Sequence, residues 1–211
     1  MFGMVFPVYA WGIPKVVKEY IEKHREEIKS AQYVYAVMTC GDDIGYADKI
    51  LNKTIGKEVD AVFSVHMPNT YVCLPFMDTD PKDVEATKLE MAEPRIAMIV
   101  DKIRRREEGD YLSKGTAPWL LTHVIGEYFN RRMVNDRKFE VITQQCIHCG
   151  KCASVCPVGN ISNHGIDNSF SPRWNHDNSC TGCLACYHHC PRHAILFGNI
   201  TRKRGQYFFG Q

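Results

Sequence analysis

The hydrophobic positions of residues 1–110 alternate between short, dense apolar runs and longer stretches in which apolar residues recur every three or four positions. Dense runs of this length are typical of buried parallel strands, and the three-to-four spacing indicates helices with one apolar face. Three strand–helix units in succession predict an α/β domain whose parallel sheet is covered by helices. We expect strands at 1–8, 33–38 and 61–66, and helices at 14–30, at 47–55 and from about 82 into the charged run 104–108.

Two features divide the chain after the third expected strand. Glu93-Pro94 interrupts the long helical pattern, and we expect a kink or a restart there because proline disfavours helix in the residue before it. Residues 109–115 are typical of a linker, and residues 118–133 of a bridging helix. The expected organisation is an α/β domain at 1–108, a linker and bridging helix at 109–140, and a cysteine-rich domain at 141–211.

Charge and composition argue against several classes of protein. The 211 residues include 26 Lys and Arg against 24 Asp and Glu, a formal net charge of +2, so there is no electrostatic argument for a nucleic-acid or membrane-surface partner. The apolar start at 1–14 is too short to span a bilayer, and no basic residue precedes Lys15 as a secretory signal requires. We expect a cytoplasmic protein with neither a nucleic acid nor a membrane as partner.

Ten cysteines are the unusual feature of the composition, and eight of them form a repeat. The other two, Cys40 and Cys73, stand alone, and a lone cysteine is typically a small apolar side chain. The offset along the chain that carries Cys146 onto Cys180 carries the whole first group of four onto the second, and we call it the repeat offset. Each half has the pattern C-x2-C-x2-C-x3-C-P. The two groups are Cys146, Cys149, Cys152 and Cys156, and Cys180, Cys183, Cys186 and Cys190.

This spacing suits an iron–sulfur cluster. Three thiolates, each at the third position after the one before, lie on one tight loop and can reach three irons of a compact cube. The fourth lies a helical turn further on and points the other way, and in two-cluster ferredoxins it ligates the opposite cluster. We therefore predict two [4Fe-4S] clusters with crossed ligands: Cys146, Cys149, Cys152 and Cys190 for cluster 1, and Cys180, Cys183, Cys186 and Cys156 for cluster 2.

Two other uses of the cysteines fit the pattern less well. Structural zinc also takes C-x2-C pairs, but it has no use for a third cysteine in the run or for a Cys-Pro end. Four disulfides conflict with a reducing compartment. The corresponding alternative function is a non-redox binding module, in which structural metal holds the cysteine-rich part and the α/β part is an inert scaffold.

The cysteine-rich region is basic before any cluster binds. From residue 141 onward six Lys and Arg oppose two Asp, a formal charge of +4. Clusters held by thiolates bring negative charge that offsets this excess, which favours an electron carrier over a nucleic-acid binder. The run Arg202-Lys203-Arg204 is either a docking patch for an acidic redox partner or a solvated turn.

Three stretches of the α/β part carry a resemblance to a known family. Residues 6–14 (FPVYAWGIP), 39–46 (TCGDDIGY) and 64–71 (SVHMPNTY) are similar to the flavodoxin loop after the third strand, the loop after the fourth, and the fifth-strand region. With the cysteine repeat, the chain resembles the flavodoxin–ferredoxin fusion proteins of anaerobic bacteria and archaea. The resemblance implies the fold class α/β plus α+β. A truncated flavodoxin-like parallel sheet with helices is followed by a two-[4Fe-4S] ferredoxin domain. The implied FMN-binding residues are Pro7, Tyr9, Trp11, Gly12, Thr39, Cys40, Gly41 and Asp42.

The resemblance starts at the counterpart of the family's third strand, and the family's phosphate-binding loop has no counterpart here. We therefore expect FMN to bind weakly or not at all. In the strand order 2-1-3-4-5, the strand at residues 1–8 then lies at the edge of the sheet. Because an uncharged edge strand is a template for pairing, we expect this sequence either to belong to a longer reading frame or to cover the edge with a second copy of itself.

These patterns predict an electron-transfer protein rather than a stand-alone catalyst. Two [4Fe-4S] clusters would pass single electrons to and from redox partner proteins, coupled to FMN in a longer form of the chain.

Overall fold

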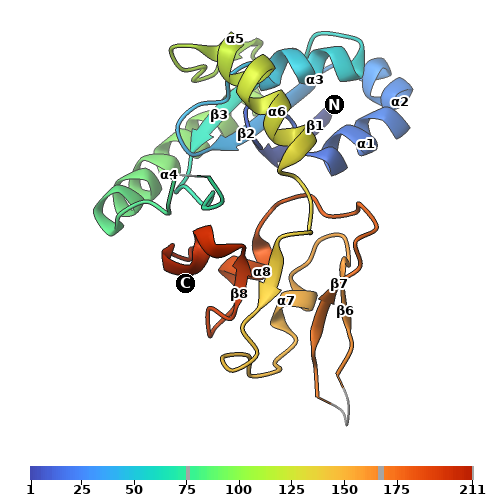
Figure 1. Cartoon of the computed structure of the whole chain (residues 1–211). Coiled ribbons are helices and arrows are strands. Elements are labelled where there is room, and N and C mark those ends of the chain that lie inside the picture. Colours follow the sequence, from blue (N-terminus) through green and yellow to red (C-terminus); the bar gives the residue numbers. More distant parts are fainter. Residues whose placement is uncertain (75–76, 166–168, 211) are drawn as a thin grey trace. The chain divides into compact units, whose positions relative to one another are not determined.

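The structure is a computed structural model that describes residues 1–74, 77–165 and 169–210. The chain forms two compact units, each with its own core (Figure 1). The first unit consists of Met1–Asn69 and Pro81–Arg131, and the second of Thr70–Asp80 and Arg132–Gln211. The second unit therefore takes a short segment from within the sequence of the first. No helix of the described residues is both long enough and apolar enough to cross a membrane.

The first unit is a parallel sheet with helices in the connections. Its four strands are all parallel and follow the order β1-β2-β3-β4. The mixed α/β architecture predicted from the apolar runs is confirmed. The elements in chain order are β1 (Phe2–Pro7), α1 (Lys15–Lys23), α2 (Arg25–Ser30), β2 (Val34–Cys40), α3 (Ala47–Ile55), β3 (Ala61–His66), α4 (Lys82–Arg104), β4 (Gly109–Tyr111), α5 (Pro118–Leu120), the π-helix η1 (Leu121–Gly126) and α6 (Glu127–Arg132).

The two faces of the sheet are covered by different helices. Helices α1, α2 and α3 bury Ile21, Ile28 and Leu51 against one face, where β1 contributes Met4 and Phe6. Helix α4 packs on the other face, and Figure 1 shows it apart from the other three. The buried residues of α4 lie against β3. The core on this face is therefore centred near β3 and away from the edge strand β1.

Strand β1 is less buried than its apolar sequence predicts. Burial alternates along the strand, and Val5 is 71% exposed, so the expectation of a strand buried on both faces is wrong. The physical reason is that the core under α4 does not extend to β1, which lies at the edge and pairs with β2 only, among the strands described. The side chain of Tyr35 lies over Gly3, where a Cβ would come within 2.2 Å of its ring.

Two other expectations need correction, and a third is met with an unexpected helix type. Of the kink or restart expected at Glu93-Pro94, the restart is excluded, because helix α4 runs through Pro94 as one helix. Residues 109–111, expected in a linker, instead form β4, because Gly109 N–H donates to the Asp60 carbonyl at 3.0 Å and Tyr111 stacks on Phe63. The bridging helix is present but wound as a π-helix over Leu121–Gly126.

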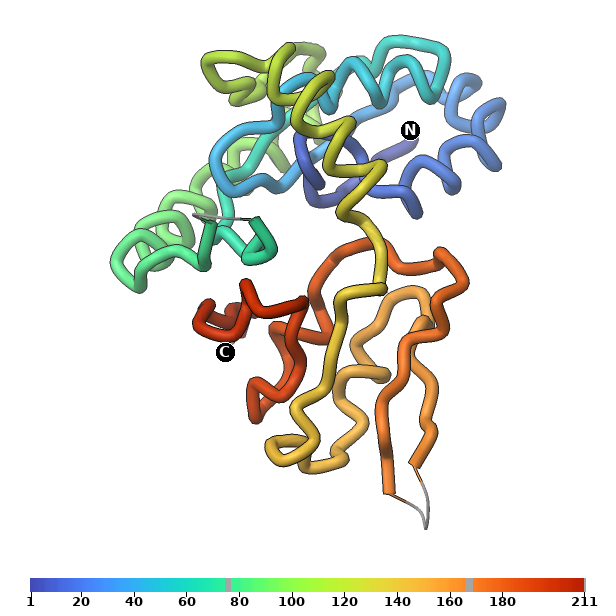
Figure 2. Tube along the Cα trace, viewed as in Figure 1, coloured from blue at the N-terminus to red at the C-terminus, as the bar shows by residue number. Residues whose placement is uncertain are grey.

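In its described residues, the second unit consists of two short antiparallel ribbons, two one-turn α-helices and a 3₁₀ helix. Strand β5 pairs with β8, and β6 pairs with β7, although β5 and β8 come from opposite ends of the unit (Figure 2). The elements are β5 (Phe139–Val141), α7 (Lys151–Ser154), β6 (Ile161–Asn163), β7 (Pro172–Trp174), α8 (Ala185–His188), β8 (Ile195–Phe197) and the 3₁₀ helix η2 (Asn199–Lys203).

The duplication predicted from the cysteines is confirmed in the backbone. The repeat offset carries α7 onto α8 and β6 onto β8. It also relates three pairs of residues with positive φ, a backbone conformation that side chains other than glycine rarely adopt. The pairs are His148 and Gly182, Gly150 and Leu184, and Gly159 and His193.

Candidate iron–sulfur site

Each cysteine run folds as a loop that turns into a short helix. In the first run Gly150, with φ of 69°, reverses the backbone immediately before α7, and Leu184, with φ of 59°, does the same before α8. The left-handed turn brings the third cysteine of each run, Cys152 or Cys186, back towards the first two. In the second run this left-handed position is occupied by a leucine instead of a glycine. The surrounding residues must therefore hold the backbone in its left-handed conformation there.

The eight cysteines of the repeat line two cavities, and each cavity mixes the two runs. The empty space at cavity 1 is about 360 Å³ and at cavity 2 about 310 Å³, both counted together with the space open to solvent. Their similar size matches the duplication of the chain. Cavity 1 is lined by Cys146, Cys149, Cys152 and Cys190, and cavity 2 by Cys156, Cys180, Cys183 and Cys186.

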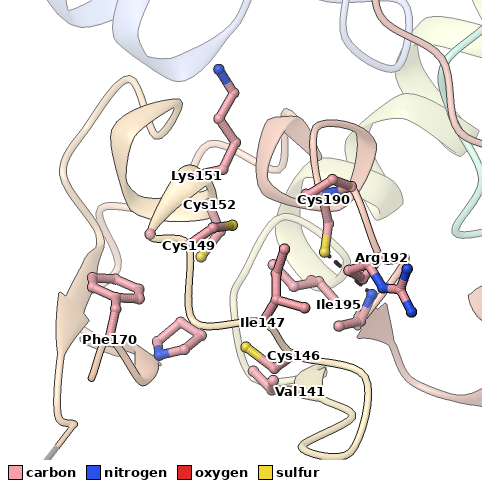
Figure 3. A pocket seen from close by; sticks show the side chains of 14 residues that line it. Val141, Cys146, Ile147, Cys149, Lys151, Cys152, Phe170, Cys190, Arg192 and Ile195 are labelled. Atoms are coloured by element: carbon pink, nitrogen blue, oxygen red, sulfur yellow. Dashed lines mark hydrogen bonds between the residues drawn. The ribbon is translucent and has the colours of Figure 1, made fainter.

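Figure 3 shows how the thiols are arranged in cavity 1. Cys149 and Cys152 lie on one side, Cys190 on the other and Cys146 below. The fourth cysteine thus reaches the cavity from the end of the second run, after α8. The rest of the lining is mostly apolar, including Ile195 and Phe170. The four sulfurs surround a common space from different directions.

The fourth cysteine of each run accepts a hydrogen bond from a backbone amide. The Asn160 N–H donates to Cys156 Sγ at 3.2 Å, and the Ala194 N–H donates to Cys190 Sγ at the same distance. The repeat offset relates the two contacts. An amide donor stabilises negative charge on a sulfur, and hydrogen bonds of this kind are one of the means by which proteins tune cluster potentials.

Burial keeps several of these thiols protonated when no metal is bound. It raises the pKa of Cys152 to about 11 and that of Cys180 to about 11, and it holds the pKa of Cys186 well above its usual range. A ligating cysteine must be a thiolate, so metal binding here releases protons and restores the charge balance of a buried site.

The donor set of each cavity fits a [4Fe-4S] cluster. Such a cluster is held by four cysteine thiolates and offers a separate iron to each, so its ligands surround it instead of meeting at one point. Among the described residues, no three His, Cys, Asp or Glu side chains come close enough to share a single metal ion. The arrangement of four thiols round a cavity with apolar walls is what the larger group requires.

Residues 145–195 match the family model of the 4Fe-4S dicluster domain. The chain therefore contains a ferredoxin-type 4Fe-4S domain, which supports binding of at least one 4Fe-4S cluster. The matched segment contains all eight cysteines of the repeat. No curated protein sequence matches the chain significantly.

A buried carboxylate connects three parts of the second unit. Asp136 is 3% exposed and accepts hydrogen bonds from Asn160 Nδ2 at 2.8 Å, and from the backbone N–H and ring Nδ1 of His176 at 3.1 and 2.8 Å. Burial acts to raise the pKa of the Asp136 carboxyl, but these hydrogen bonds outweigh it and hold the pKa below its usual range. Sequence periodicity gives no signal for this network, because its members are far apart in the chain.

Two side chains of α8 fasten other segments to the domain. The Tyr187 hydroxyl lies 2.9 Å from the Arg204 carbonyl and 2.8 Å from His193 Nε2. His188 donates from Nε2 to the Thr70 carbonyl at 2.6 Å and accepts from the Tyr207 N–H at Nδ1. Burial lowers the pKa of His188 to about 4, so it is neutral at pH 7. These contacts hold 70–74 and the C-terminal segment against the helix that carries Cys186.

The residues implied to face FMN lie at the ends of β1 and β2 and in the two loops that follow these strands. Tyr9 and Gly12 close a tight turn through two backbone hydrogen bonds of 3.0 Å. Trp11 lies in this turn, and a Cβ added at Gly45 would lie 2.9 Å from Trp11 Cβ. The two loops are thus in direct contact, and a flavin ring placed between them would have to break these interactions.

The π-helix η1 adds a further connection between the same loops. Thr122 Oγ1 accepts from the Tyr46 N–H at 2.8 Å and donates to the Trp11 carbonyl at 3.3 Å. A Cβ at Gly126 would lie 2.3 Å from the Ala10 carbonyl oxygen, so glycine is needed where η1 approaches the turn. The loops therefore pack as part of the first unit's structure.

The remaining implied flavin residues have local partners. Pro7 is the last residue of β1, and Thr39 lies opposite it in β2. A Cβ at Gly41 would lie 1.9 Å from Asn69 Oδ1, and Asp42 accepts from Asn69 Nδ2 at 3.3 Å. Cys40 is 5% exposed, and burial raises the pKa of its thiol to about 12, as suits a packing role.

We predict that Asp136→Asn destabilises the ferredoxin-type domain by about 2 kcal/mol, because the amide cannot accept all the hydrogen bonds that the carboxylate accepts. The measurement is denaturant unfolding followed by the fluorescence of Trp174, which stacks on Phe139, in a chain whose other tryptophans, Trp11 and Trp119, are replaced by phenylalanine. Glu140→Gln, which removes the same charge at an exposed site in β5, is the control and should change stability by less than about 0.5 kcal/mol.

The Asp136 contribution should also depend on pH with a definite sign. Because the folded pKa is depressed, its stabilisation is complete above the unfolded value of about 3.9 and is lost as the pH falls through the folded pKa. The difference between wild type and Asp136→Asn should therefore be constant from about pH 5 to 7 and shrink below about pH 4. Equal unfolding of both proteins at pH 7 would show that the carboxylate does not stabilise the domain.

Proposed function

We propose that this chain is an electron-transfer protein that holds two [4Fe-4S] clusters, one in each cavity, with crossed ligands. The observation that carries the proposal is the composition of the cavities: each is lined by three cysteines of one run and the fourth cysteine of the other. Cluster 1 would be held by Cys146, Cys149, Cys152 and Cys190, and cluster 2 by Cys180, Cys183, Cys186 and Cys156.

The residues around the cavities have defined tasks in this function. When bound, such clusters accept and release single electrons. The thiolates bind the irons, and the Asn160 and Ala194 amides donate to two of the sulfurs. Asp136 and His188 hold the supporting segments in position, so that the ligands move little when the charge of the site changes. Small structural changes on electron transfer favour fast exchange.

The alternative, a non-redox module with structural metal, differs in an observable property. Structural zinc requires four ligands that converge on one ion and gives a colourless protein. The described thiols surround two cavities, which supports the interpretation as cluster sites. Anaerobically reconstituted protein should be brown and should contain about eight iron atoms and about eight sulfides per chain.

Crossed ligation predicts which cluster each fourth cysteine supports. Cys156→Ser should disturb the cluster held by the second run, and Cys190→Ser the cluster held by the first. Paramagnetic spectra of the reduced variants, with the two cluster signals assigned, measure this. Cys73→Ser, which changes a buried cysteine outside the repeat, is the control and should leave both signals in place. Loss of the cluster nearest in sequence to each mutation would contradict the crossed arrangement.

For this chain we propose no bound flavin, although the resemblance to flavodoxin–ferredoxin fusions and the parallel sheet favour a flavodoxin-like origin for the first unit. The contact of Trp11 with Gly45 and the hydrogen bonds of Thr122 to both loops support the absence of flavin, because they join the loops between which a flavin would lie. FMN fluorescence should therefore change little when the chain is added at concentrations up to about 10 μM, where even modest affinity is detected. Tight, stoichiometric quenching of FMN fluorescence would contradict the proposal that the chain binds no flavin.

We also propose that a second copy of the chain pairs with β1. The outer edge of β1 has no partner among the described strands, its six residues carry no charge, and Val5 is 71% exposed. Such an edge favours pairing with another strand. Sedimentation should show a dimer that Val5→Lys converts to a monomer, because antiparallel pairing brings like charges together. Val84→Lys, at an exposed site on α4, should remain dimeric. A monomeric wild type would exclude the pairing.

A further inference from the structure

The two cavities differ in how they meet the solvent. Cys149 is exposed at cavity 1, and beside it Ile147 is 56% exposed. At cavity 2 the corresponding positions are less open, since Cys183 is only partly exposed and Thr181 is 4% exposed. The repeat offset relates Ile147 to Thr181 and Cys149 to Cys183, so equivalent positions of the repeat have different exposure. Cavity 1 is the one that a partner protein can approach closely.

The charges around the two cavities differ as well. Lys151 and Arg192 line cavity 1 and are exposed, whereas no charged residue of the described chain lines cavity 2. Neither cation forms an ion pair with any residue that the structure describes. Figure 3 shows both side chains extending away from the four cysteines, in different directions. Their charged groups are therefore what an approaching surface meets first.

The nearest acidic residue in the sequence does not neutralise this rim. Val141 lines cavity 1, and side chains alternate along a strand, so Glu140 points to the opposite face of β5. The exposed rim thus combines a hydrophobic contact at Ile147 with the two cations, Lys151 and Arg192. A small apolar centre flanked by charge of one sign is suited to brief, oriented contact with a surface of the opposite sign.

We propose that the rim of cavity 1, formed by Ile147, Cys149, Lys151 and Arg192, is the docking surface through which this chain exchanges electrons with an acidic redox protein. The inference rests on the proposed cluster function and adds the site of exchange and the charge of the partner. In the step, one electron leaves the reduced cluster 1 and reduces a one-electron acceptor in the partner. No covalent bond forms or breaks, and no proton needs to move.

The run Arg202-Lys203-Arg204 is the competing basic surface. Arg204 lies 3.5 Å from the Asp78 carboxylate, which reduces its availability, and none of the three lines either cavity. Arg202 and Lys203 are exposed on η2. Reversing the charge of both Arg202 and Lys203 changes the net charge of the chain by the same amount as reversing the charge of both Lys151 and Arg192. The two pairs therefore separate a local effect at the rim from an effect of total charge.

The test uses the full chain with its clusters reduced, and two oxidised one-electron acceptors of opposite charge: rubredoxin, which is small and acidic, and a basic c-type cytochrome. Stopped-flow rates are measured at about 10 mM and about 300 mM salt, where screening is weak and strong. Association of the oxidised proteins is measured separately by calorimetry. Iron content and the spectra of both clusters are recorded for every variant.

At low salt, Lys151→Glu with Arg192→Glu should slow the reaction with rubredoxin about tenfold and weaken association, while high salt removes the difference. The same pair should speed the reaction with the basic cytochrome. Arg202→Glu with Lys203→Glu should change both rates less than about twofold. If charge reversal reduces the iron content, Lys151→Gln with Arg192→Gln replaces it and should slow the rubredoxin reaction about threefold.

The outcomes that overturn the inference are distinct from those that overturn the cluster function. If the η2 variant slows rubredoxin as much as the rim variant, the rim is not the docking surface. Unchanged rates and association in the rim variant, with clusters intact, lead to the same conclusion. A wild-type chain that binds no iron–sulfur cluster would instead refute the proposed function on which the inference rests.

Discussion

Four thiols from two separate parts of the chain must face one cavity, and the second unit is built around that requirement. Three of the four come from a single loop, so the local backbone alone can bring them together. The fourth, Cys156 or Cys190, follows a helical turn and lines the cavity of the other run. Neither half of the repeat can therefore complete its cavity alone, and the halves are interlocked by their ligands. The left-handed residues before α7 and α8 follow from the same need to turn the chain sharply.

The polar contacts of the second unit explain how so small a region keeps a definite shape. Its core is a limited cluster of aromatic and aliphatic side chains packed around several of the cysteines. Asp136 joins the segments before and after the first run, and Tyr187 and His188 fasten distant segments to α8. Buried polar groups are costly unless they are paired, so these contacts also favour one arrangement over its alternatives. They connect the segments that carry the ligands.

The first unit is a conventional helix-covered sheet, in contrast to the second. Its loops at the carboxyl ends of β1 and β2 are connected by Thr122 and by the contact of Trp11 with Gly45. Ligands of open α/β sheets usually bind at such ends, but here the loops contact each other. The core under α4 does not reach β1. The apolar side chains of β1 on that face of the sheet are therefore exposed.

The amino-acid sequence by itself determined the features that depend on short-range pattern. The spacing of the cysteines predicted the duplicated unit, and the apolar runs predicted three of the four strands of the parallel sheet almost to the residue. Both work because chain geometry over a few residues is narrowly limited. Strand β4, the continuity of α4 through Pro94 and the exposure of β1 were decided only by packing against distant residues. The same is true of the Asp136 network and of the difference between the two cavities. In each case the energy comes from partners far apart in the sequence, and only the tertiary structure brings them together.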